Sequence, residues 1–197
     1  TRAHAEVTIP SMATLLHIPE IETPKLVVRE IVEDDWAAFA TYMTRRDYQQ
    51  WIAARLASAA KVRGFVRSVL ARQDWPQRRT FHVAAVTKAS GRVIGDGFIL
   101  MAGDRSAEIG WGVAPARWGR GVGTDIAKAL VALSIERLGA TKVWCKVMAP
   151  NAASVRVAEK AGLEHRRTFE GHPAAQGETV SVHVLALDAN GYFEAAY

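Results

Sequence analysis

Pro115-Ala116-Arg117-Trp118-Gly119-Arg120-Gly121-Val122-Gly123-Thr124 is the stretch around which the rest of the chain is organised. It follows an alternating segment, residues 108–113, that is typical of a strand, and it precedes a long segment with helical apolar spacing. The first N–H groups of a helix have no intrahelical partner, and the helix dipole adds positive charge there. Glycine lets the backbone approach a ligand, and Arg120 adds a cation. The stretch therefore predicts a phosphate-binding loop, the alternative being a turn that only joins strand to helix.

The two common nucleotide-binding patterns fit this loop poorly. The Walker pattern needs Gly-Lys-Ser/Thr after a spacer of four residues, whereas here Gly119 is followed five positions later by Thr124, with no lysine in place. The dinucleotide pattern needs an acidic residue about twenty positions after its glycines, where this chain has Thr141.

The loop instead resembles the acetyl-CoA pyrophosphate loop of GNAT N-acetyltransferases, Gln/Arg-x-x-Gly-x-Gly/Ala, with Trp118 in place of the Gln or Arg. Trp118-Gly119-Arg120-Gly121 is similar to the Trp-Gly-Lys/Arg-Gly motif of the branch that acetylates the N-termini of ribosomal proteins. Residues 151–163 are similar to that branch's Asn-x-x-Ser-x-x-x-x-Glu-Lys-x-Gly-Phe, and Glu108-Ile109-Gly110-Trp111 resembles its Glu-Ile-Gly-Tyr strand. Thr23-Pro24-Lys25-Leu26-Val27-Val28-Arg29 is similar to the first strand at the start of that branch's sequences. Four motifs in the right order extend the resemblance over about residues 23–188.

The pattern of apolar residues predicts an α+β chain. We expect strands at about 26–30, 80–87, 92–101, 107–113, 141–148, 163–170 and 179–187, and helices at about 33–43, 46–56, 58–74, 121–138 and 151–162. The three strands joined by short turns are expected to be antiparallel. This order matches the GNAT fold, a mixed, mostly antiparallel sheet flanked by helices. The resemblance implies that acetyl-CoA lies in a cleft between two splayed parallel strands, 107–113 and 141–148.

The resemblance also implies the residues that hold the co-substrate acetyl-CoA. Main-chain groups near Val113 are expected to pair with the pantetheine and polarise the thioester carbonyl. The expected pyrophosphate loop consists of Trp118, Gly119, Arg120, Gly121, Val122, Gly123 and Thr124. Asn151 is a candidate for a cofactor contact, but asparagine is also a favoured helix N-cap.

Acetyl transfer to an amine needs a group that accepts the amine's proton, and Glu108 is the candidate base. Strand alternation places it on one face with Gly110 and Gly112, and these glycines are expected to leave room for the substrate. The alternative for Glu108 is an exposed carboxylate paired with Arg105 or another cation. Asp96 interrupts an apolar strand and could bind a cationic amine, or be an acid at the strand edge.

The group that protonates the leaving thiolate is less clear from the sequence. Many GNAT enzymes have a tyrosine at the position that Ala158 matches here, so Ser154 is the candidate donor, the alternative being a hydroxyl near a helix start. Cys145 lies in an apolar strand without a neighbouring base, which indicates a core residue rather than a nucleophile. The six histidines show no metal-ligand spacing, so no metal is expected. Trp51 is a candidate for lining the acceptor pocket.

Length and composition narrow the classes of protein. The chain has 197 residues, 49% hydrophobic and 23% charged, as expected for one globular domain. We expect an extension at 1–22 and a single acetyltransferase domain at 23–197. One cysteine excludes an internal disulfide. The net charge of +5 is dispersed, so nucleic-acid binding is not expected. There is no long apolar span and no secretory signal, so we expect a cytoplasmic protein, without a membrane partner, as a monomer or homodimer.

The sequence thus predicts an acetyl-CoA-dependent N-acetyltransferase. The expected acceptor is a protein N-terminal amine of the ribosomal-protein type, attacked directly in a ternary complex. One alternative is a small amine, such as a polyamine, an aminoglycoside or an amino-acid derivative. Another is a coenzyme A-binding module without catalysis, because the tyrosine is missing at Ala158. A third is a basic protein associated with the ribosome or with nucleic acid.

Overall fold

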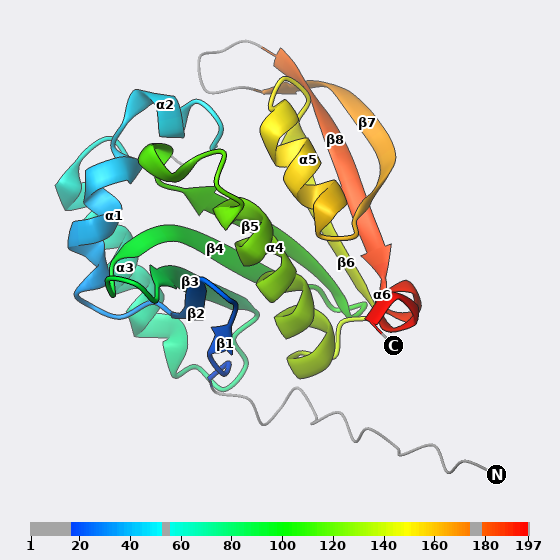
Figure 1. The fold of residues 1–197 in the computed structure, drawn as a ribbon, viewed down its shortest axis with the longest axis horizontal. Helices are drawn as coiled ribbons and strands as arrows, with labels where there is room; N and C mark the ends of the chain where they lie inside the picture. The colour runs from blue at the N-terminus through cyan, green and yellow to red at the C-terminus, as the bar shows by residue number, and fades with distance from the viewer. Residues whose placement is uncertain (1–16, 53–55, 174–178, 197) are drawn as a thin grey trace.

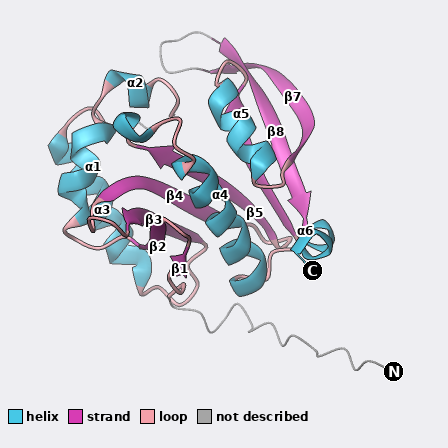
Figure 2. Cartoon of the chain, viewed as in Figure 1, coloured by secondary structure: helices cyan, strands magenta, loops and turns pink. Residues whose placement is uncertain are grey.

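The structure is a computed structural model that describes residues 17–52, 56–173 and 179–196. Its centre is an eight-stranded sheet in the order β1-β2-β3-β4-β5-β6-β8-β7, with helices on its faces (Figures 1 and 2). The strands are β1 (Ile21–Glu22), β2 (Leu26–Glu30), β3 (Thr80–Thr87), β4 (Val93–Met101), β5 (Ser106–Val113), β6 (Lys142–Met148), β7 (Glu164–Pro173) and β8 (Thr179–Asp188). The helices are α1 (Asp35–Met43), α2 (Arg46–Gln49), α3 (Ala59–Gln73), α4 (Val122–Ala132), α5 (Ala152–Lys160) and α6 (Ala189–Ala196).

The sheet contains one parallel pair, β5 with β6, and every other neighbouring pair is antiparallel. A parallel pair needs a crossover connection, which α4 supplies between β5 and β6. The predicted fold class, a mixed and mostly antiparallel sheet flanked by helices, is confirmed.

Two apolar clusters hold the layers together. In the larger cluster, α4 and α5 pack on one face of the sheet, with Ile126 and Leu130 of α4 fully buried against β4 and β5. In the smaller cluster, α1 and α3 pack on the other face around Phe39, Val62 and Val66. Figure 1 shows α4 crossing in front of β4 and β5, and α5 lying over the strands that follow. Helices thus cover the two faces of the sheet around β4 and β5.

Some elements differ from the sequence prediction. The helix expected at 46–56 ends at Gln49, because Tyr48 is its buried residue and one anchor supports only a single turn; residues 53–55 lie outside the described part. The central helix continues beyond Ala132 as a π-helical turn, Leu133–Arg137. The short β1 and the C-terminal α6 were not predicted. A two-residue strand is too short for a visible alternation, and Gly191 lowers the helix propensity of α6.

Residues 17–22, which the prediction assigns to an extension, contact the domain. Ile18 is buried in the larger cluster, and Ile21 and Glu22 pair with β2 at the edge of the sheet. Residues 1–16 lie outside the described part of the chain, so the division at residue 22 stays a prediction.

Candidate active site

The two parallel strands β5 and β6 separate after a short paired region. They pair at Ser106 with Lys142, Ala107 with Val143 and Glu108 with Trp144, and the pairing stops there although both strands continue. Strand β5 remains paired with β4 as far as Val113. The sheet therefore opens on one side of β5, at the place where the sequence predicts a cleft.

Main-chain groups of β5 point into this opening. The N–H of Ala114 donates to the carbonyl of Ile94 at 2.9 Å, so even-numbered residues at this end of β5 direct their N–H and C=O groups toward β4. Odd-numbered residues, including Trp111 and Val113, direct theirs to the other side, where β6 has moved away. The polar backbone of Val113 thus faces the opening, as the predicted pantetheine contact requires.

The loop after β5 ends at the start of α4. Gly119 and Gly121 have φ of +72° and +83°, in the left-handed region that favours glycine. Gly121 is the N-cap of α4 and has no side chain with which to cap the helix, and the first helical bond runs from Asp125 N–H to Gly121 C=O at 3.0 Å. The N–H groups of Val122, Gly123 and Thr124 therefore precede the helical ladder. Arg120 is exposed beside them.

Gly123 brings three elements together. A Cβ at this position would lie 3.3 Å from Val157 Cγ2 of α5 and 3.6 Å from Val113 Cγ2 of β5. The start of α4, the end of β5 and the middle of α5 are therefore in close contact. The structure thus places the predicted loop directly beside the opening between β5 and β6.

Trp118 attaches the loop to the strand. Its indole Nε1 donates to the carbonyl of Val113 at 2.7 Å, although the side chain is 45% exposed. This hydrogen bond uses the Val113 carbonyl and leaves the Val113 N–H for another acceptor. Trp118, where the family usually has Gln or Arg, therefore has a structural contact of its own.

Asn151 and Ser154 lie together at the start of α5. The Asn151 side-chain oxygen accepts from the N–H of Ser154 at 3.1 Å, which is a helix N-cap. The capping alternative for Asn151 is therefore observed, and its cofactor role stays a prediction. Ser154 is half-buried, and Ala158, one turn further on, is fully buried and has no donor side chain.

Glu108 is the last residue of β5 that pairs with β6. Its side chain is 21% exposed, and Oε1 lies 3.6 Å from Nζ of Lys146 on β6. Arg105, the partner considered from the sequence, instead donates to the carbonyl of Gly139. The candidate base therefore stands at the point where the strands separate, with a lysine beside it.

The prediction that Gly110 and Gly112 leave room for a substrate was wrong. A Cβ on Gly110 would lie 2.3 Å from the ring of Phe98, and one on Gly112 would lie 2.1 Å from the Tyr48 hydroxyl and 2.6 Å from Asp96 Oδ1. The space above both glycines is filled by the protein's own side chains. Strand alternation identified the face correctly, but it cannot show which side chains from α2 and β4 occupy it.

A cluster of two tyrosines and one aspartate occupies the space above Gly112. The hydroxyls of Tyr42 and Tyr48 both donate to Asp96 Oδ1 at 2.8 Å, and their rings meet edge to face. Burial, and then the Asp96 charge, raises the pKa of both tyrosines well above its ordinary value. Burial also raises the pKa of Asp96, which the two hydroxyls partly offset. Asp96 thus ties α1 and α2 to β4, a role that the sequence did not indicate.

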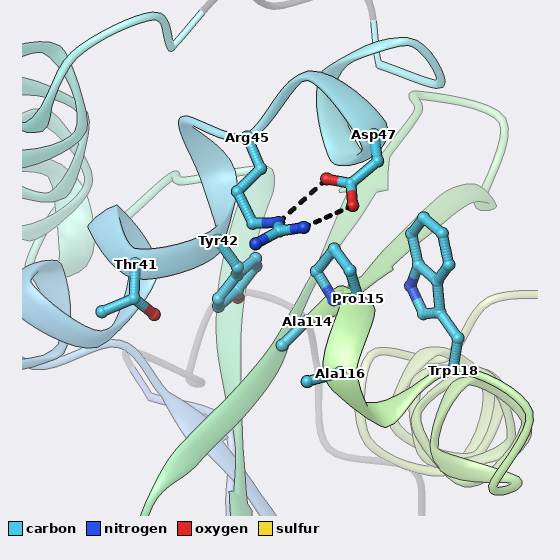
Figure 3. Close-up of a pocket in the computed structure, with 8 residues that line it drawn as sticks. All are labelled: Thr41, Tyr42, Arg45, Asp47, Ala114, Pro115, Ala116 and Trp118. Carbon is cyan, nitrogen blue, oxygen red and sulfur yellow. Dashed lines mark hydrogen bonds and ion pairs between the residues drawn. The ribbon is translucent and has the colours of Figure 1, made fainter.

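A surface pocket of about 420 Å³ lies between this cluster and the loop (Figure 3). It is lined by Thr41, Tyr42, Arg45, Asp47, Ala114, Pro115, Ala116 and Trp118. Figure 3 shows the Arg45–Asp47 ion pair on one side and Pro115 and Trp118 on the other. A second pocket of about 480 Å³ shares Arg45 and Asp47 and adds Arg46 and Gln50. Trp51, predicted to line an acceptor pocket, is not among these residues.

Cys145 and the expected absence of a metal site and a membrane span are the remaining points from the sequence. Cys145 is buried in the larger cluster, and desolvation raises the pKa of its thiol to about 12, which fits the predicted core role. Within residues 17–52, 56–173 and 179–196, no three His, Cys, Asp or Glu side chains are grouped so as to hold a metal ion. In the same ranges, no helix has both the length and the apolar character needed to cross a membrane.

Comparisons with known proteins agree with this geometry. A family model described as an acetyltransferase (GNAT) domain matches residues 25–164. An uncharacterized N-acetyltransferase of Bacillus subtilis (strain 168), YoaA, is 22% identical over 172 residues, covering 86% of this chain and 96% of that protein.

Solved structures share the fold at low identity. A ribosomal-protein-S5-alanine acetyltransferase from Vibrio fischeri superposes with a TM-score of 0.77 at 13% identity, over 87% of this chain and 97% of that one. RimJ of Mycobacterium smegmatis, in complex with CoA-disulfide, superposes with a TM-score of 0.74 at 15% identity, over 91% and 94% of the two chains.

Proposed function

This chain belongs to the GNAT acetyltransferase family, and from that premise we propose that it moves an acetyl group from acetyl-CoA to a protein N-terminal amine, by direct attack in a ternary complex. The observation that supports this most is the start of α4, which presents unpaired N–H groups beside the opening between β5 and β6. With the pyrophosphate of acetyl-CoA at the helix start and its pantetheine along β5, the acetyl group would lie near Glu108.

The pyrophosphate of the co-substrate fits the loop. Main-chain N–H groups of residues 121–124, the positive end of the α4 dipole and the exposed Arg120 are all suited to phosphate oxygens. The N–H of Val113, which faces the opening beside the loop, would hold the pantetheine. Asn151 would position these groups indirectly, by capping α5.

Glu108 would accept the proton of the attacking amine. Its carboxylate stands at the inner end of the opening and is half-buried, so it can reach the amine directly or through a water. The amine nitrogen then bonds the acetyl carbon, the C–S bond breaks, and the thiolate takes a proton. Ser154 would be the donor, at the N-terminal turn of the helix that contacts Gly123. Because the pKa of a thiol is about 8.5, the thiolate is a fair leaving group, and a hydrogen bond from Ser154 would be enough to assist its departure.

The charges around the pockets favour a peptide over a polyamine. The two adjoining pockets carry two cations, Arg45 and Arg46, and one anion, Asp47, which is paired with Arg45. This lining repels a polycation. The two pockets adjoin at Arg45 and Asp47, and together they would accommodate the first residues of a peptide.

Two measurements test this proposal. Calorimetry with coenzyme A tests the loop, and thiol release with peptides, polyamines and aminoglycosides tests the acceptor. We expect binding, with the fastest turnover on peptides, and a fall of about a hundredfold or more in kcat for Glu108→Gln. Glu164→Gln, at an exposed carboxylate on β7, is the matched control.

Other results would point elsewhere. The absence of both binding and turnover contradicts the proposal. Binding without turnover, unchanged by Glu108→Gln, indicates a coenzyme A-binding module instead. Turnover confined to polyamines or aminoglycosides would show that the acceptor is a small amine rather than a peptide, and would leave the proposed acetyl transfer unchanged.

A further inference from the structure

Lys146 is a primary amine beside the proposed base. Its Nζ lies 3.6 Å from Glu108 Oε1 and 4.9 Å from the centre of the Trp144 ring, so two contacts hold the ammonium at this place. The side chain is 47% exposed. Lys146 follows Trp144, the last β6 residue paired with β5, by two positions, and therefore lies on the same face of the strand beside the opening.

We propose that Lys146 is a site of self-acetylation, an inference that rests on the proposed function. An acetyl thioester positioned for attack near Glu108 is also near the amine that Glu108 already contacts. The ammonium gives one proton to the Glu108 carboxylate, and the free amine bonds the acetyl carbon. The C–S bond breaks, coenzyme A leaves as a thiolate and takes up one proton from solvent, the nitrogen loses a second proton to water, and Glu108 returns its proton to solvent. The products are Nζ-acetyl-lysine, coenzyme A thiol and one released proton.

The modification would change the surroundings of Glu108. Acetylation removes the positive charge of Lys146, and with it the ion pair with Glu108 and the cation contact with Trp144. Glu108 would then face the opening without the Lys146 ammonium beside it. The acetylated protein would thus have a different base environment from the unmodified one.

Lys142 is the matched control on the same strand. It lies on the same face and is also exposed, but it precedes the opening and is about 13 Å away along the strand. Exposed lysines elsewhere, such as Lys61 and Lys128, report the background of chemical acetylation. Preference for Lys146 over Lys142 therefore measures position rather than exposure.

The test is peptide mapping by mass spectrometry after incubation of the whole protein with acetyl-CoA. We expect acetylation of Lys146 at least tenfold faster than of Lys142, with a first-order rate constant that does not change over a tenfold range of protein concentration. Glu108→Gln should reduce the rate at Lys146 to that at Lys142, and excess coenzyme A should protect Lys146 alone. An acetyl N-hydroxysuccinimide ester, used without acetyl-CoA, should show no such preference.

Each contrary result has one meaning. Equal rates at the two lysines, a rate proportional to protein concentration, or the same preference with the ester overturns self-acetylation. Calorimetry with coenzyme A on the same sample separates the causes. Intact binding with Lys146 unmodified overturns this inference alone, whereas loss of binding overturns the proposed function with it.

Discussion

The start of α4 and the cluster of Tyr42, Tyr48 and Asp96 flank the same end of β5, and they are built from different materials. The first consists of backbone N–H groups within one short stretch, shaped by glycines with positive φ. The second consists of side chains from α1, α2 and β4, in which Tyr42 and Tyr48 are 54 and 48 positions from Asp96 in the sequence. A site made of backbone can be recognised in a local motif, whereas a site made of side chains forms only when distant elements pack.

The comparison predicts that the side-chain region is the more fragile of the two, and Asp96→Ala should show this most strongly. The substitution leaves the hydroxyls of Tyr42 and Tyr48 buried without their shared acceptor, which should lower the free energy of unfolding by about 2–4 kcal/mol. Urea denaturation measures the loss. Asp96→Asn keeps an acceptor oxygen and should lose about 1 kcal/mol or less, with coenzyme A affinity unchanged. An affinity that falls with Asp96→Asn would mean that the two regions are coupled.

The strands that adjoin the side-chain region should respond to acid. His82 on β3 lies against Phe65 and Phe98, and burial, followed by the charge of Arg72, lowers its pKa from 6.5 to about 4. The unfolded chain therefore binds this proton first as the pH falls, so stability is lost between pH 6.5 and 4, by at most about 3 kcal/mol. His82→Phe should flatten this part of the stability curve. His165→Phe, at an exposed histidine on β7, should not; an equal effect of both would exclude His82 as the cause.

In the backbone region, Gly121→Ala should have a smaller effect on stability and a clear one on binding. Its φ of +83° costs an alanine about 1–2 kcal/mol, and a shift of the helix start should weaken coenzyme A binding about tenfold. Thermal melting and calorimetry measure the two effects. Gly64→Ala, in the middle of α3 with open space around it, should instead gain about 0.5–1 kcal/mol. Unchanged binding in Gly121→Ala would remove the loop from the site.

The smallest effect is expected at Trp118, where one side chain supports the backbone region. Trp118→Phe keeps an aromatic ring and removes the hydrogen bond to the Val113 carbonyl, which should cost about 0.5–1 kcal/mol. The dissociation constant of acetyl-CoA should rise about twofold to fivefold. Trp75→Phe, at a more exposed tryptophan, should leave it unchanged. A fall in the dissociation constant for Trp118→Phe would show that the indole competes with the ligand for Val113.

The comparison also explains what the sequence could and could not predict. The alternation of β3 and β5 and the glycines around Gly121 are local signals, so the strands and the loop followed from them, whereas the parallel pair was expected only from the family resemblance. The role of Asp96 could not be predicted, because an aspartate in an apolar strand shows no partner nearby in the sequence. The two tyrosines that donate to it lie on α1 and α2. The same reason applies to Gly112, whose missing side chain accommodates Tyr48 rather than a substrate. Lys146 and Glu108 are close because the β5–β6 register places Glu108 opposite Trp144, two residues before Lys146, and this register is not visible in the sequence.

The early end of the β5–β6 pairing has a thermodynamic consequence. The main-chain groups of Trp111 and the N–H of Val113, which would bond a neighbouring strand, are left to a small molecule or to water, whereas the Val113 carbonyl accepts from Trp118. A ligand that pairs with them in the folded chain raises the free energy of unfolding, by about 2.7 kcal/mol at a concentration one hundred times its dissociation constant. The melting temperature of this protein should therefore rise with the concentration of its acyl donor, so a larger supply of that donor would keep a larger fraction of the copies folded.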